Sequence, residues 1–198
     1  MPKKSRLMTN STMKIAITGG AASGKSTVLS RFKSLGAAAL DSDALVRDLR
    51  ADPDWLAQVR AIFGKEAFDS DGKFDAQALG RIVFDNPEAR RSLNAITHPI
   101  VLRRIRSLAD DRTVVEVPLL VETSLQGEFD QIVATEAGAA AQRKRLEARG
   151  VANEVAEGIL RSQLSDDERR NFADWVIDTG KTVENTYGQV DKIWALLS

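Results

Sequence analysis

The fold is decided by the stretch Thr18-Gly19-Gly20-Ala21-Ala22-Ser23-Gly24-Lys25-Ser26-Thr27, which follows the short apolar run Lys14-Ile15-Ala16-Ile17. It fits the phosphate-binding loop pattern: glycine, four residues, glycine, lysine, then serine or threonine. Glycines have no Cβ, so successive backbone N–H groups can turn inward around phosphate oxygens. The apolar run predicts a buried strand, and apolar residues at helical spacing after the loop predict a helix. We therefore interpret the stretch as a phosphate cradle between a strand and a helix.

Two residues of the loop add chemistry that a polyphosphate needs besides backbone amides. We expect Lys25 to bridge the β- and γ-phosphates of ATP and the Ser26 hydroxyl to bind Mg²⁺. Both residues open the following helix, whose first N–H groups lack intrahelical partners and whose dipole favours negative charge. The alternative is a glycine-rich turn that happens to precede a lysine. The strand and helix on either side favour the phosphate loop, with ATP and Mg²⁺ as cofactors.

Composition narrows the class of protein. The 198 residues suffice for one domain with a sizeable core. Lys plus Arg equals Asp plus Glu, 28 each, so no net basic charge favours nucleic acid or an anionic membrane. The absence of cysteine excludes disulfides and thiolate chemistry, and suits a cytoplasmic location. No apolar run is long enough to span a bilayer, and residues 1–12 are interpreted as a disordered extension, with Met13 an alternative start.

A second strand is predicted at Ala37-Ala38-Ala39-Leu40, with Asp41 at its carboxyl end. Strand, helix and strand within about thirty residues are typical of a βαβ unit in a parallel sheet. Ligands bind at the carboxyl ends of such strands, so Asp41 is expected to face the loop. A kinase needs a group that accepts the proton of the acceptor hydroxyl, and Asp41 is the best placed candidate. Asp43 is a candidate for assisting it or facing the metal; for both residues the alternative is capping of a helix that begins near Ala44.

The rest of the chain divides by its periodicity. Helical spacings and the caps Asp52-Pro53 and Asn86-Pro87 predict a helical insertion. Further strands are predicted at residues 113–117, 130–135 and 175–177, with three helices between the last two. The prediction is an α/β protein with a three-layer α/β/α core and a five-stranded parallel sheet, resembling a P-loop NTPase. The core comprises about 13–43, 112–136 and 174–198, the insertion about 44–111, and a lid about 137–173.

Three sets of residues leave alternatives open. Glu116, near the end of the third strand, is either a support for the metal or a solvent-facing acid. Arginines on the three helices after the fourth strand are able to stabilise a transferring phosphoryl group, but interleaved acids favour an ordinary solvated face for most of them. His98 is the only histidine, and a lone histidine is more often structural than catalytic.

At this point the sequence resembles the dephospho-coenzyme A kinase family over nearly the whole chain, from Lys14 to about Gly180. The resemblance rests on the order and spacing of several motifs together. They are the loop from Thr18 to Thr27, Leu40-Asp41-Ser42-Asp43 with Arg47, Phe84-Asp85-Asn86-Pro87, His98-Pro99, Val117-Pro118-Leu119-Leu120-Val121-Glu122, Arg145, Arg149, Gln163, Arg169 and Ala173-Asp174-Trp175-Val176-Ile177-Asp178.

The resemblance implies ATP-dependent phosphorylation of the ribose 3′-hydroxyl of dephospho-coenzyme A, the last step of coenzyme A biosynthesis. It implies a core, a helical coenzyme A-binding insertion and a lid over ATP, in a monomer or weak homo-oligomer. Asp41 resembles the proposed base, with Lys25 and Arg145 also catalytic. The expected ATP-binding residues are Gly20, Ala22, Ser23, Gly24, Lys25, Ser26, Thr27, Arg145 and Arg149. Ser26 and Asp43 are expected at the metal, and Asp41, His98, Pro118, Leu119 and Glu122 at the acceptor.

The chain departs from the family pattern at a few positions. Ala21-Ala22 stands where isoleucine-glycine is usual, so the loop has lost one permissive residue, and we look first here for altered backbone geometry. Ser42 replaces an alanine. Thr179 replaces a frequent asparagine, which places a nucleotide contact there in doubt. None of these changes removes a chemical group that the mechanism needs.

Two rivals remain at the level of sequence. A nucleoside or nucleoside monophosphate kinase would share the core, but no second guanidinium-rich monophosphate site is recognisable. A nucleotide-dependent switch would hydrolyse nucleotide slowly with little response to an acceptor. Switches of the GTP type usually read guanine through asparagine-lysine-x-aspartate, and that element does not occur in this chain.

Overall fold

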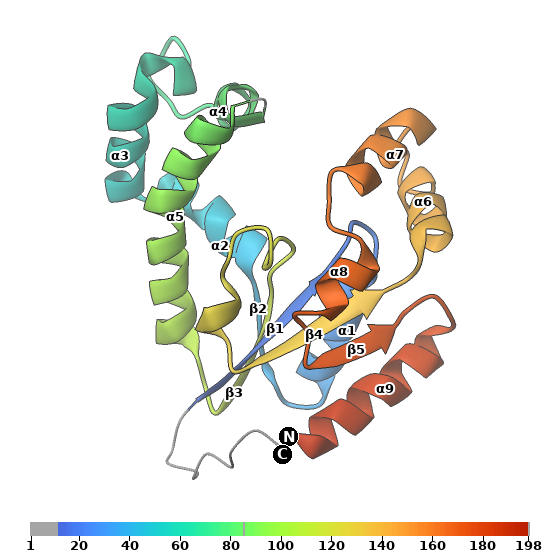
Figure 1. Ribbon diagram of the computed structural model, residues 1–198. Coiled ribbons are helices and arrows are strands. Elements are labelled where there is room, and N and C mark those ends of the chain that lie inside the picture. The colour runs from blue at the N-terminus through green and yellow to red at the C-terminus, as the bar shows by residue number, and fades with distance from the viewer. Residues whose placement is uncertain (1–11, 85, 198) are drawn as a thin grey trace. The chain divides into compact units, whose positions relative to one another are not determined.

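The computed structural model describes residues 12–84 and 86–197. Its sheet has five parallel strands in the order β2-β3-β1-β4-β5 (Figure 1). The strands are β1 (Met13–Gly19), β2 (Ala38–Asp41), β3 (Arg112–Glu116), β4 (Gln131–Glu136) and β5 (Trp175–Asp178). The predicted five-stranded parallel α/β fold is confirmed. Because all strands run the same way, the loop after β1 and the last residue of β2 lie at the same edge of the sheet.

One face of the sheet is covered by α1 (Lys25–Ser34) and α9 (Val183–Leu196), which pack against each other. Alternate residues of β1 point into this layer, since side chains of a strand alternate between faces. The Phe32 and Trp194 rings meet edge to face, with centroids 5.8 Å apart. The core consists of Ile15, Ile17, Val28, Phe32, Ala37, Val114, Val133, Ile177, Val190 and Ile193.

Three short helices lie between β4 and β5, as the sequence predicts. They are α6 (Ala139–Glu147), α7 (Asn153–Arg161) and α8 (Asp166–Arg170). A capping box begins α8: Ser165 Oγ accepts from the Glu168 N–H, and the Glu168 carboxylate accepts from the Ser165 N–H. A 3₁₀ turn, η3 (Gln126–Glu128), precedes β4.

Residues Ser42–Leu108 form a compact unit of their own, and the chain up to Asp41 together with the chain from Ala109 forms another. The elements of the former are α2 (Ser42–Asp48), η1 (Leu49–Ala51), α3 (Pro53–Phe63), η2 (Gly64–Ala67), α4 (Ala76–Phe84) and α5 (Pro87–Leu108). The predicted caps hold, since Asp52 accepts from the Asp54 and Trp55 N–H groups and Asn86 from those of Glu88 and Ala89. The helix expected near Ala44 begins earlier, at Ser42, because the chain turns directly from strand into helix.

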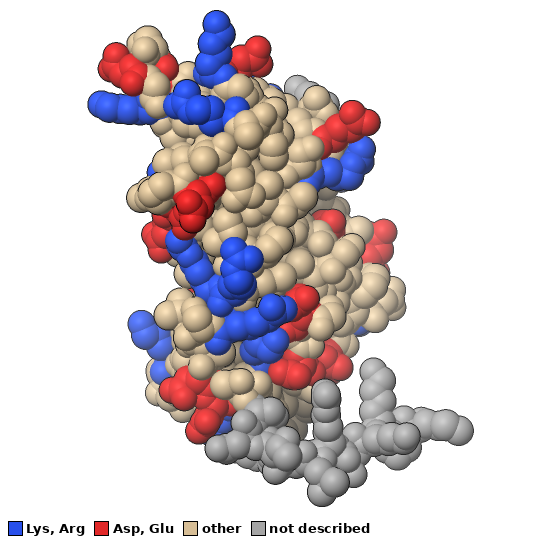
Figure 2. Space-filling model, turned by 90° about the vertical axis from the view of Figure 1, so that its left-hand side faces the viewer, with Lys and Arg blue, Asp and Glu red and all other residues tan. Residues whose placement is uncertain are grey.

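Three further features of the sequence can be compared with the described part of the chain. The extension predicted at residues 1–12 lies outside it apart from Thr12, and β1 begins at Met13. None of the helices in residues 12–84 and 86–197 is both long enough and apolar enough to cross a membrane. On the face drawn in Figure 2, basic and acidic side chains are interspersed, in keeping with the equal totals of 28 in the sequence.

Candidate functional site: a nucleotide and acceptor site at one edge of the sheet

The loop between β1 and α1 has the backbone geometry of an anion cradle. Gly24 takes a φ of 89°, and a Cβ there would lie 3.1 Å from Thr179 Cβ, so this position requires glycine. The start of α1 has no side-chain cap and no acidic residue in its first turn. The dipole of α1 therefore favours negative charge, such as that of phosphate oxygens, at this end of the helix.

Lys25 is held inside the loop, and the residue is only 9% exposed. Its Nζ donates to the carbonyl oxygens of Gly19, at 3.1 Å, and of Gly20, at 3.0 Å. These bonds place the ammonium group on the inner side of the loop, beside the peptides that the sequence assigns to phosphate binding. Ser26 is exposed at the first turn of α1.

A cavity of about 230 Å³ lies beside the loop. It brings together six of the residues predicted to bind ATP: Ala22, Gly24, Ser26, Thr27, Arg145 and Arg149. The remaining lining residues are Thr179, Lys181, Val183 and Thr186. The last three were not predicted, because the motifs of the resemblance end before them, whereas Thr179 is the departure from the family pattern at which a nucleotide contact was in doubt. Ser23 lies under the loop instead, fully buried, with its hydroxyl 2.7 Å from that of Thr135.

Arg145 joins the loop to the β5–α9 connection. From α6 its Nη1 donates to the Ala22 carbonyl at 3.1 Å, and its Nη2 to the Thr179 carbonyl at 2.6 Å. The Thr179 hydroxyl lies 2.6 Å from the Ser23 carbonyl oxygen. Thr179 therefore supports the loop directly, a role that its replacement of an asparagine did not reveal.

Asp41 and Glu116 are paired in register as the last residues of β2 and β3. Glu116 is in turn paired with Ile17 of β1, two residues before Gly19, where the strand ends. Adjacent strands are about 4.8 Å apart, so the Asp41 backbone lies about 10 Å from that of β1. Both carboxylates consequently sit at the edge of the sheet that carries the phosphate loop.

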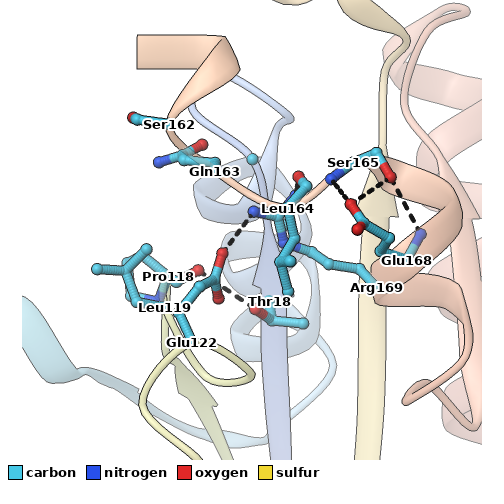
Figure 3. Close-up of polar contacts among 12 residues, drawn as sticks. Thr18, Pro118, Leu119, Glu122, Ser162, Gln163, Leu164, Ser165, Glu168 and Arg169 are labelled. Carbon is cyan, nitrogen blue, oxygen red and sulfur yellow. Dashed lines mark hydrogen bonds and ion pairs between the residues drawn. The ribbon is translucent and has the colours of Figure 1, made fainter.

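The segment after β3 contacts both β1 and α8 (Figure 3). Thr18 Oγ1 donates to the Pro118 carbonyl at 3.3 Å, and Leu119 is 43% exposed. Glu122 accepts from Arg169 Nη2 at 2.9 Å, and Arg169 Nη1 donates to the Leu164 carbonyl at 2.7 Å. The Arg169 side chain is 1% exposed and that of Glu122 is 22% exposed. The sequence did not predict this ion pair, although Glu122 and Arg169 both belong to the motifs of the resemblance. Residue types alone do not indicate which charged side chains contact each other.

Asp43 and His98 belong to the helical unit Ser42–Leu108. Asp43 is the second residue of α2, because the helix begins at Ser42, so it does not precede the helix as the capping alternative expected. Its carboxylate lies in the first turn, where the helix dipole favours negative charge. His98 lines a cavity of about 260 Å³ together with Trp55 and Thr97, whose side chains are joined by a hydrogen bond of 3.1 Å. Burial lowers the pKa of His98 below its usual value, since the charged imidazolium loses hydration there. Within the described ranges, no three His, Cys, Asp and Glu residues are grouped so as to hold a metal ion.

A phosphate cradle on a five-stranded parallel sheet, with a carboxylate on a neighbouring strand, is typical of the P-loop class of nucleotide-binding proteins. A shikimate kinase from Acinetobacter baumannii in complex with shikimate has a similar structure, with a TM-score of 0.58 at 17% identity over 95% of this chain and 94% of that one. At that level of identity the similarity shows the fold alone. The acceptor is identified by relatives of higher sequence identity.

The chain belongs to the dephospho-CoA kinase family. The sequence model described as dephospho-CoA kinase matches residues 13–185. A dephospho-CoA kinase of Leifsonia xyli subsp. xyli is 46% identical over 192 residues, which cover 91% of this chain and 96% of that protein. The crystal structure of TT1252 from Thermus thermophilus is similar with a TM-score of 0.82 at 30% identity, covering 94% of this chain and 98% of that one. The activity is thus ATP-dependent phosphoryl transfer to the alcohol of dephospho-CoA, and both rivals raised by the sequence are set aside.

Proposed function

We propose that the chain transfers the γ-phosphoryl group of ATP directly to the ribose 3′-hydroxyl of dephospho-CoA, with Asp41 as general base. The observation that carries this assignment is the position of Asp41 at the end of β2, in register with Glu116 and at the sheet edge that bears the loop. Because β3 lies between β2 and β1, a phosphoryl group and an attacking oxygen would lie beyond the carboxyl ends of these strands, between Asp41 and the loop.

The transfer balances as a single displacement. The acceptor oxygen O3′ forms a bond to the γ-phosphorus while its proton passes to the Asp41 carboxylate. The bond between the γ-phosphorus and the oxygen that bridges to the β-phosphorus breaks, and ADP leaves with that oxygen. General base assistance by a positioned carboxylate contributes about 10²- to 10⁴-fold to such a step.

Charge that develops during transfer is stabilised by groups around the loop. Lys25, held by the Gly19 and Gly20 carbonyls, would exchange those bonds for phosphate oxygens. Arg145 and Arg149 line the cavity beside the loop, where an ATP molecule bound to it would extend. Fixed cations at this place lower the barrier because they do not have to reorganise as the charge moves.

Mg²⁺ is the proposed metal, bound mainly through ATP. Ser26 offers an exposed hydroxyl at the first turn of α1, the kind of oxygen donor that a phosphate-held Mg²⁺ takes. Asp43 and Glu116 are the proposed carboxylates. When bound, the ion would neutralise charge on the β- and γ-phosphate oxygens.

The acceptor contacts are proposed from the remaining predicted residues. Leu119, exposed beside the buried Leu120, is proposed to contact dephospho-CoA together with Pro118. Glu122 forms an ion pair with Arg169, so its proposed role is to hold the segment that follows β3 in place. His98 is proposed to contact the acceptor from the cavity of the helical unit. We also propose a cytoplasmic monomer or weak homo-oligomer.

A coupled assay of ADP release tests the acceptor assignment. Purified protein with ATP and Mg²⁺ is supplied with dephospho-CoA, shikimate, nucleosides or nucleoside monophosphates at equal concentrations. We expect ADP release that depends on dephospho-CoA. Equal rates with the other acceptors would refute the assignment, and release without any acceptor would favour a hydrolase.

A further inference from the structure

Ala22 takes a backbone conformation that L-amino acids disfavour. Its φ is 56°, and among the described residues other than glycine only Ser124 shares a positive φ. In this region the Cβ lies too close to the following carbonyl oxygen, so an alanine, unlike a glycine, is strained. A strained residue persists only where its surroundings hold it in place.

The residues that hold Ala22 come from one face of α6. Gln142 Nε2 donates to the Ala21 carbonyl at 3.1 Å, and Arg145 Nη1 donates to the Ala22 carbonyl at 3.1 Å. These carbonyls belong to the two peptide groups that flank the Cα of Ala22. Since Gln142 and Arg145 are three residues apart in a helix, they lie on the same face. Together they fix the orientation of both peptides and thereby both dihedral angles of Ala22.

Gln142 is fitted closely to the loop. The residue is only 6% exposed, and a Cβ added to Gly20 would collide with Gln142 Nε2. The neighbouring Ala21 N–H donates to Gln163 Oε1 at 2.8 Å, so the lid side chains hold both the N–H and the C=O of Ala21. Gln142 therefore has one place to lie, and that place determines the geometry of the loop.

We propose that Gln142 is a positioning residue for ATP, which holds the phosphate loop in its binding geometry by maintaining the left-handed conformation of Ala22. Gln142 acts through Ala22. Its support is needed because this chain has alanine at a position where glycine would adopt the same conformation without strain. The inference rests on the proposed role of the loop in binding the phosphates of ATP.

A double-mutant cycle between positions 142 and 22 tests the inference. Gln142→Met keeps the length of the side chain and removes the N–H donor. Loss of one net hydrogen bond predicts that the Kd for ATP, measured by calorimetry, rises about five-fold in the parent. In the Ala22→Gly background the same change is expected to raise it less than about two-fold, because glycine needs no support to keep φ positive. KM for ATP should follow the Kd, with kcat nearly unchanged.

Gln131→Met is the matched control. Gln131 accepts from Trp175 Nε1 at 2.8 Å and begins β4, at the sheet edge opposite to the loop. We expect this variant to lose stability without a change in ATP affinity.

Three outcomes would count against these proposals. Equal increases in Kd on Gln142→Met in the parent and in the Ala22→Gly background, or no increase in either, would overturn the inference. Parent protein that binds no ATP would instead refute the proposed function of the loop.

Discussion

Arg169 and Glu122 form an ion pair whose Nη2 and Oε1 atoms lie 2.9 Å apart, with the arginine side chain only 1% exposed. The pair joins α8 to the segment that follows β3. Arg169 Nε has no hydrogen-bond partner within the described residues, so the buried cation depends on Glu122 and the Leu164 carbonyl for its hydrogen bonds.

Neutralising Glu122 is expected to destabilise the fold. Removing one partner of a buried ion pair leaves the other charge uncompensated, which costs about 3–5 kcal/mol. We expect Glu122→Gln, which keeps the shape and one acceptor, to lower the free energy of unfolding by at least about 2 kcal/mol, a figure below that range because one acceptor remains. Denaturation by urea measures the change.

Glu88→Gln supplies the matched control for this prediction. Glu88 pairs with Arg91 at 3.8 Å, and the two side chains are 88% and 72% exposed. Exposed pairs contribute about 0–1 kcal/mol, so this variant should unfold almost as the parent does. Equal losses in the two variants would show that burial of the Arg169 pair has no energetic consequence.

Asp41→Asn is expected to separate chemistry from nucleotide binding. An amide cannot accept the proton of the 3′-hydroxyl, so kcat should fall by about 10²- to 10⁴-fold. The Kd for ATP should stay within about two-fold of the parent, since the loop that binds phosphate is unchanged. Asp48→Asn, at an exposed position in α2, is the control and should leave both constants unaltered. Retained turnover with lost ATP affinity in Asp41→Asn would contradict the role as base.

His98 provides a prediction for pH dependence. Its pKa is lowered by burial, so the unfolded chain takes up a proton on this group before the folded chain does as the pH falls. Stability is therefore unaffected well above the unfolded pKa of about 6.5 and falls as the pH drops from there towards the folded value. His98→Asn should lack this component of the pH dependence in denaturant titrations.

The imidazole of His98 also reports on the acceptor. It is the only histidine of the chain, so its NMR signals need no assignment among several. Titration of the free protein should give a pKa below about 6.5. Addition of dephospho-CoA should shift these signals if His98 contacts the acceptor, and unchanged signals at saturation would remove His98 from the acceptor site.

Local patterns predicted most of the framework. The apolar run before Gly19 and the cap at Asp52 depend only on neighbouring residues, and the structure has the expected strand and helix there. The Ala21-Ala22 departure also directed attention to the right place, since Ala22 has a positive φ. A glycine-rich loop, a strand and a helix within one stretch of chain are readable because each follows from short-range geometry.

The remaining features depend on contacts between distant residues. Gln142 meets Ala21 across 121 positions and Arg169 meets Glu122 across 47. The residues around a glutamine in a polar helix do not differ according to whether its side chain faces solvent or a loop carbonyl. The sequence therefore contains no sign of the contact that Gln142 makes. The support that Thr179 gives to Ser23 was hidden for the same reason.

The site of phosphorylation tests the central claim most directly. Dephospho-CoA is incubated with ATP, Mg²⁺ and the purified protein, and the product is examined by mass spectrometry and by phosphorus–proton correlated NMR. The account predicts a single new phosphomonoester coupled to the ribose 3′ proton, formed in equal amounts with ADP, and no product from a 3′-deoxy analogue. A phosphate on another hydroxyl, or ADP formed without a phosphorylated acceptor, would contradict it.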